Sequence, residues 1–143
     1  MTGHPRPSWP SWTLGILYGL VLLAGGWILG PLRVMVVAPL IGPLAAVGFE
    51  APLLTAVMAL TVRWMERLNL IGRRPVRRAA MGLTGACVVL MGEVVGALLA
   101  PDRREALSRF FAPAGLLGLA LVGVVAVIPL VLLAWPSPDR RLR

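Results

Sequence analysis

The uncharged stretch WTLGILYGLVLLAGGWILG, residues 12–30, decides the fold class of this chain. A helix needs about 20 predominantly apolar residues to cross the hydrocarbon core of a membrane. Three further stretches of the chain meet that requirement. The predicted spans are Trp12–Gly30, Leu44–Val62, Ala79–Ala100 and Phe110–Trp135. The sequence therefore predicts an all-α, polytopic membrane protein with four transmembrane helices, folded as a single domain over residues 1–143.

The composition agrees with this class. Hydrophobic residues make up 58% of the 143 residues and charged residues only 14%, too few to form the polar shell of a soluble domain. A signal peptide is not expected, because the first apolar run is long and no small-x-small cleavage site follows it.

The arginines predict the orientation. Four spans place both termini on one side of the membrane, together with the connection between the second and third spans. That side would hold Arg6, Arg63, Arg67, Arg73, Arg74, Arg77, Arg78, Arg140, Arg141 and Arg143, and the other side Arg33, Arg103, Arg104 and Arg109. Because cytoplasmic loops are enriched in positive charge, we expect both termini in the cytoplasm of a bacterium, with the chain in its inner membrane. Tryptophans at both predicted interfaces, Trp9, Trp12, Trp64 and Trp135 inside and Trp27 outside, favour the same orientation.

Several function classes are disfavoured. The net charge of +8 flanks apolar spans without a basic-aromatic surface, so nucleic acid is not an expected partner. Cys87 is the single cysteine and His4 the single histidine, so no metal site, disulfide or bis-histidine haem site is predicted. We predict no cofactor, although a bound lipid or pigment would require little more than an apolar groove.

The two outer connections differ in character. PLRVMVVAPLIGP, residues 31–43, is apolar and rich in proline. Either the first helix continues to about Ala38, which we favour, or this loop dips into the outer leaflet. In the second connection, Asp102 and Glu105 have the spacing of a capping box, which predicts a short interfacial helix through Phe111.

Glu50 and Glu93 stand alone inside apolar spans, where an ionisable side chain marks a function or a buried polar contact. Counted along their helices, both lie roughly 9–10 Å below the outer edge. Arg33 leaves the first span near that edge and is long enough to reach either carboxylate. The three residues form either a structural polar contact that locks the bundle, or an ion or proton site. A contact to a partner subunit, a lipid headgroup or a pigment is the third alternative.

Glycines four residues apart predict where helices pack closely. The pairs are Gly15 and Gly19, Gly26 and Gly30, and Gly92 and Gly96. These faces would serve packing within the chain or contact with a partner protein.

The most basic stretch, RWMERLNLIGRRPVRR, spans residues 63–78. We interpret it as a loop that anchors the protein to anionic lipid headgroups or to an acidic cytoplasmic partner. The predicted anchor residues are Arg63, Arg67, Arg73, Arg74, Arg77 and Arg78.

A series of short motifs resembles a set of uncharacterised four-helix membrane proteins of proteobacteria. The matching residues are Gly26, Gly30 and Arg33, the APLIG of residues 38–42, Glu50-Ala51-Pro52, Arg63-Trp64, Met81-Gly82, Gly92-Glu93 and Pro113-Ala114-Gly115. The resemblance covers most of the chain from the first span to the start of the fourth. It implies a bacterial inner-membrane location and supports Arg33, Glu50 and Glu93 as a set, without implying an activity.

Two functions follow as hypotheses. The first is a small accessory or structural subunit of a larger inner-membrane complex, of respiratory or photosynthetic type, in contact with membrane lipids and other subunits. The alternative is a small proton- or cation-coupled transporter or channel that uses Glu50 and Glu93 and acts as a dimer. Catalysis is not expected, because Asp102, Glu105 and Ser108, which form one helical cluster on the outer side, are better explained by helix capping and solvation.

Overall fold

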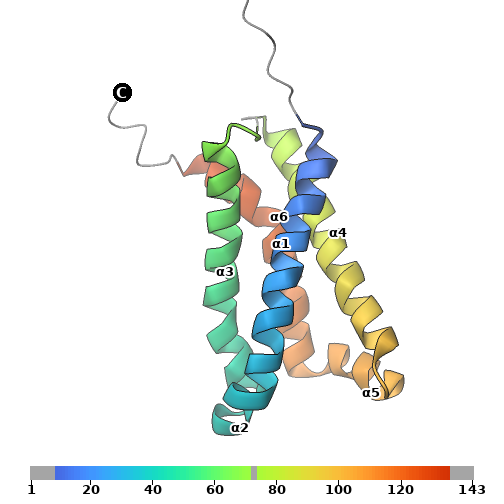
Figure 1. Cartoon of the computed structure of the whole chain (residues 1–143). Helices are drawn as coiled ribbons and strands as arrows, with labels where there is room; N and C mark the ends of the chain where they lie inside the picture. The colour runs from blue at the N-terminus through green and yellow to red at the C-terminus, as the bar shows by residue number, and fades with distance from the viewer. Residues whose placement is uncertain (1–8, 72–73, 136–143) are drawn as a thin grey trace, which may run out of the picture.

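The computed structural model describes residues 9–71 and 74–135, and every element in these ranges is helical (Figure 1). The elements in chain order are α1 (Ser11–Leu32), η1 (Arg33–Val37), α2 (Ala38–Ile41), α3 (Pro43–Arg67), α4 (Pro75–Leu99), α5 (Arg103–Ser108), η2 (Arg109–Phe111) and α6 (Pro113–Ala134). Four continuous helical stretches are long and apolar enough to cross a membrane: Ser11–Ile41, Pro43–Arg67, Pro75–Leu99 and Pro113–Ala134. For the described residues, the prediction of an all-α protein with four helices long and apolar enough to cross a membrane is therefore confirmed.

The first helical stretch is much longer than the predicted span. It continues through the π-helical segment η1 and the single turn α2, as the preferred alternative expected. Pro31 lies inside α1 and removes one backbone donor, and the wider π turn follows directly after it. The stretch ends at Gly42, whose φ of 85° and ψ of 157° are accessible almost only to glycine. This sharp turn sends α3 back along α1.

The connection between α3 and α4 is shorter than the basic stretch of residues 63–78 suggested. Helix α3 ends in a Schellman motif: Leu70 N–H donates to the carbonyl of Met65, and Asn69 N–H to the carbonyl of Glu66. Asn69 provides the left-handed residue that this motif requires, with φ 56°. The arginines of this stretch therefore belong mostly to helices, which fixes the direction of their side chains.

The short helix in the second connection is confirmed. The carboxylate of Asp102 accepts a hydrogen bond of 3.0 Å from the backbone N–H of Glu105, which caps α5. The 3-10 turn η2 then carries the chain to Phe111, where Pro113 begins α6.

The four long helices form a ring in the order α1, α4, α6, α3. Helix α1 packs most extensively on α4, and α6 packs on both α4 and α3. Helices α3 and α4 are consecutive in the chain, yet they lie on a diagonal of the ring without backbone contact in the described residues, as do α1 and α6.

The apolar core occupies one half of the bundle, which we call the terminal half: residues 11–22, 55–67, 75–87 and 124–134, where α1 begins and α6 ends. The buried core residues are Leu14, Tyr18, Leu22, Met58, Val62, Met65, Met81 and Val125. In the opposite, distal half, the buried residues are Ala46, Val47, Glu50 and Ala97. Figure 1 shows the consequence: α1 and α4 are close where both begin and separate toward α5.

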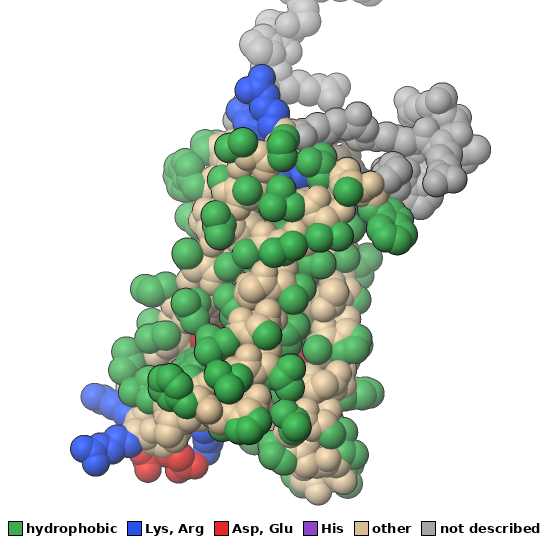
Figure 2. Space-filling view, turned by 180° about the vertical axis from the view of Figure 1, so that it is seen from behind, with side chains coloured by type: hydrophobic (Ala, Val, Ile, Leu, Met, Phe, Trp, Pro, Cys, Tyr) green, Lys and Arg blue, Asp and Glu red, His purple; other side chains and the backbone are tan. Residues whose placement is uncertain are grey.

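The outer surface of the bundle is apolar between its two ends. Figure 2 shows hydrophobic side chains over the middle of the face seen from behind, with arginines at one end and arginines beside acidic side chains at the other. Four exposed tryptophans, Trp9, Trp12, Trp64 and Trp135, lie at the terminal end. This distribution is typical of a membrane protein whose ends lie at the lipid-water interfaces.

Candidate functional site

An ion pair joins Arg33 to Glu50 in the distal half of the bundle. Nη1 of Arg33 lies 3.2 Å from a carboxylate oxygen of Glu50. Glu50 is only 7% exposed, whereas the Arg33 side chain is 32% exposed. Of the alternatives open from the sequence, the structure therefore pairs Arg33 with Glu50.

The turn at Gly42 brings the two residues together. Arg33 is the first residue of η1 and Glu50 lies two turns into α3, and both η1 and α2 pack against α3. Counted from Pro43 at 1.5 Å per residue, Glu50 lies about 10 Å from the helix start. Leaving one charge of such a pair without its partner, at this depth in a low-dielectric environment, would be costly.

Glu93 lies on α4 and is exposed. It follows Ala86 by seven residues and Val89 by four, so it continues the face of α4 that packs on the core. Within the described ranges it has neither a hydrogen bond nor an ion pair. The structure therefore places the three predicted residues in the distal half of the bundle, with Arg33 and Glu50 in contact and Glu93 without a partner of opposite charge among the described residues.

The site combines one guanidinium and two carboxylates, for a formal net charge of −1 when all three are ionised. It can take up one further positive charge, either a proton, a metal or organic cation, or a basic side chain. The described residues contain no group of three His, Cys, Asp or Glu side chains placed to hold a metal ion.

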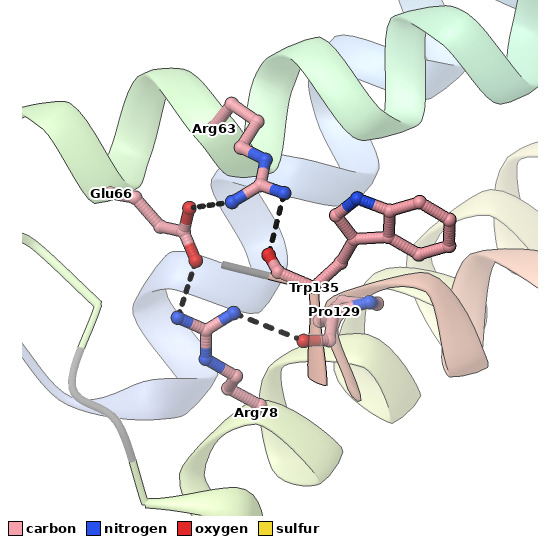
Figure 3. A network of polar contacts seen from close by, with 5 residues as sticks. All are labelled: Arg63, Glu66, Arg78, Pro129 and Trp135. Carbon is pink, nitrogen blue, oxygen red and sulfur yellow. Dashed lines mark hydrogen bonds and ion pairs between the residues drawn. The ribbon is translucent and has the colours of Figure 1, made fainter. Parts of the chain in front are cut away.

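A second polar cluster, which the sequence analysis did not predict, lies at the terminal end (Figure 3). The Glu66 carboxylate accepts from Arg63 at 3.0 Å and from Arg78 at 2.5 Å. Arg63 also donates to the carbonyl of Trp135 at 2.8 Å, and Arg78 to the carbonyl of Pro129 at 3.2 Å. This cluster, which we call the Glu66 clasp, ties α3 and α4 to α6.

The clasp changes the interpretation of the basic stretch. Arg78 was predicted to reach lipid headgroups, but it is only 3% exposed, because the rotation of α4 turns it toward α6. Arg63 is half-buried and also points into the clasp. Arg67, Arg74 and Arg77 are exposed and remain placed for a lipid or protein surface. Arg73 lies outside the described residues.

The predicted glycine positions divide into two groups. A Cβ on Gly15 or Gly19 would meet Thr84 or Val88 of α4, and one on Gly92 would meet Leu23 of α1. By contrast, Gly26, Gly30 and Gly96 have nothing of the described chain near their missing Cβ. These three glycines therefore make no close helix contact within the described chain.

Gly82 and Gly85, which were not predicted as packing positions, make close contacts between the long helices. A Cβ on Gly82 would meet the backbone of Ala126, and one on Gly85 would meet the ring of Tyr18. The fourth apolar run also contains Pro129. Because a proline leaves the carbonyl four residues before it without its helical N–H donor, Pro129 was the sequence signal for a polar contact on α6.

No protein-family model, curated protein or solved structure matches the chain. The fold and the site therefore define its class by themselves: a multi-pass helical membrane protein with an ion pair and an unpaired carboxylate inside its apolar spans.

Proposed function

We propose that this chain is a small accessory subunit that associates, through the distal half of its bundle, with a larger bacterial inner-membrane complex. The observation that carries the proposal is the separation of α1 and α4, which leaves helix faces of the distal half without a partner in the chain. The proposal assigns no catalytic role to the chain.

The contrast between the two halves supports this proposal. The terminal half has an apolar core and the Glu66 clasp, which hold its helices together within the chain. In the distal half, Gly26, Gly30 and Gly96 expose backbone that a neighbouring helix can approach closely. Membrane helices associate through such small-residue faces, since lipid gives no hydrophobic driving force between them.

We propose the terminal end as the cytoplasmic end and the distal half as the outer-leaflet half, with respiratory or photosynthetic assemblies as the type of partner. The excess of arginine at the terminal end supports this orientation. Two of the arginines exposed there, Arg74 and Arg77, are placed to meet anionic headgroups.

The test is purification of the chain from its own membrane in a mild detergent, followed by mass spectrometry of the co-eluting proteins. We expect partners in stoichiometric amount, and we expect Gly96→Leu to release them by filling the open face of α4. Gly118→Leu is the matched control, because Gly118 on α6 also has open space at its Cβ position. Isolation of the wild-type chain as a lone monomer would contradict the accessory role.

A specific observation favours a second candidate, a proton- or cation-coupled transporter. The buried Glu50 carboxylate contacts Arg33, Glu93 lies in the same half of the bundle, and two carboxylates in an apolar environment can exchange a proton or a cation. The closed core of the terminal half would then separate this site from the cytoplasm. If Glu50→Gln and Glu93→Gln left proton and cation flux in proteoliposomes unchanged at every pH, transport would be excluded; Glu105→Gln is the control.

A further inference from the structure

Glu93 is the one described acidic residue of the four long helices without an ion pair. Glu50 pairs with Arg33, and Glu66 pairs with Arg63 and Arg78. Glu93 precedes the end of α4 at Leu99 by six residues, so its Cα lies about 9 Å inside the span. A carboxylate at that depth is costly in lipid unless it meets a positive charge, a proton or water.

We infer that Glu93 is the docking point for a transmembrane helix of a partner chain that carries one lysine or arginine at the same depth. The inference rests on the proposed accessory role and specifies the chemistry of the partner. A basic residue in the partner is expected from charge complementarity, because Arg33, Glu50 and Glu93 have a formal net charge of −1 and the Arg33 guanidinium is already paired with Glu50.

The structure around Glu93 fits a helix better than a lipid headgroup. Lipid headgroups lie at the membrane surface, whereas Glu93 lies within the span. A protein segment that meets Glu93 from the lipid side must satisfy its backbone hydrogen bonds internally, as a helix does. Gly96 follows Glu93 by three residues on α4 and has open space at its Cβ position, as have Gly26 and Gly30 on α1. A partner helix can therefore approach α4 at Gly96 closely enough for its basic side chain to reach Glu93.

The experiment measures binding of a defined helix to the purified chain in lipid vesicles by energy transfer between two fluorophores. The probe is a synthetic leucine-alanine helix of about 20 residues with one lysine about 9 Å from its end. The matched probe carries leucine at that position. We expect the wild-type chain to bind the lysine helix roughly five- to thirtyfold more tightly, the range of an interhelical polar contact in membranes.

Two variants test whether the preference for the lysine helix depends on Glu93. Glu93→Gln should remove the preference for the lysine helix, and because Glu93 is exposed and unpaired, the variant should fold like the wild type. Glu105→Gln, which removes an exposed carboxylate on α5, should retain the preference. Equal binding of the two probes by the wild-type chain, or an undiminished preference in Glu93→Gln, would overturn the inference.

Two further results separate this inference from the proposed function. A lysine-helix preference in a chain that purifies without partners would count against the accessory role alone. Stoichiometric partners that Glu93→Gln retains, with no lysine preference, would count against the docking point alone. If the wild-type chain instead formed a dimer that both Glu93→Gln and Arg33→Gln dissociate, the occupant would be a second copy and the inference of a separate partner would be wrong.

Discussion

The Tyr18 hydroxyl donates a hydrogen bond of 3.3 Å to the carbonyl of Val125, across the centre of the terminal half. The carbonyl is free because the residue four positions later is Pro129, which has no N–H to donate. Tyr18 is fully buried, so no water replaces this donor from the surface. One side chain of α1 therefore compensates for a break in α6, and it is the direct polar link between these diagonal helices.

Tyr18→Phe should lower the free energy of unfolding by about 1–2 kcal/mol, because it leaves the Val125 carbonyl buried without a donor. In a Pro129→Ala background, the new backbone N–H can satisfy that carbonyl, and the effect of Tyr18→Phe should shrink. Unfolding in detergent, measured for the four members of this double-mutant cycle, checks the prediction. Equal effects in both backgrounds would show that the stabilisation by the Tyr18 hydroxyl does not depend on the carbonyl that Pro129 leaves free.

Glu66→Gln should lower the free energy of unfolding by about 2–4 kcal/mol, since it leaves the buried guanidinium of Arg78 without its counter-charge. Glu105→Gln is the control: its pair with Arg109 is equally short, at 2.6 Å, but both side chains are mostly exposed. Such a pair should contribute less than about 1 kcal/mol. Thermal unfolding of both variants measures the contrast, and equal effects would mean that the clasp is not screened from solvent.

Gly82→Ala should destabilise the bundle by about 1–3 kcal/mol, because its Cβ would meet the rigid backbone of Ala126 and push α6 away from α4. Gly123→Ala, on α6, has open space at the same position. That control should be neutral or slightly stabilising, since alanine is the better helix former. A destabilising control, or a harmless Gly82→Ala, would contradict the close approach of α4 and α6.

Glu50→Gln and Arg33→Gln should each destabilise the chain, because each leaves one charge of the pair unmatched about 10 Å inside the span. The double variant should be destabilised by less than the sum of the two single variants, since no unpaired charge then remains from the pair. A double-mutant cycle on unfolding in lipid bicelles checks this coupling. Simple additivity would show that the two side chains do not interact in the membrane.

The sequence predicted best what depends on local chemistry. The four spans follow from apolar length, and the cap of α5 by Asp102 follows from a spacing of three residues. The prediction that the first helix continues past Gly30 was also correct, because the proline-rich stretch contains no residue that forces a stop before Gly42.

What the sequence could not reveal depends on how the helices rotate and separate. Arg77 and Arg78 are neighbours in a basic run, and only the packing of α4 on α6 decides that Arg78 turns inward while Arg77 stays exposed. Similarly, the glycine pairs of α1 have the same spacing, but only Gly15 and Gly19 lie where α1 and α4 remain in contact. These differences arise from tertiary geometry, which a spacing pattern does not contain.

The diagonal placement of α3 and α4 has a consequence for synthesis of the chain. These two helices enter the membrane one after the other, yet they do not pack on each other and instead share α1 on one side and α6 on the other. A nascent chain ending before α6 holds them together through α1 and through the ion pair of Glu66 with Arg78, with Arg78 lacking the carbonyl of Pro129. Assembly of the bundle is therefore completed by its last helix, and a chain truncated before Pro113 should be recognised by the quality-control proteases of the membrane as unfinished.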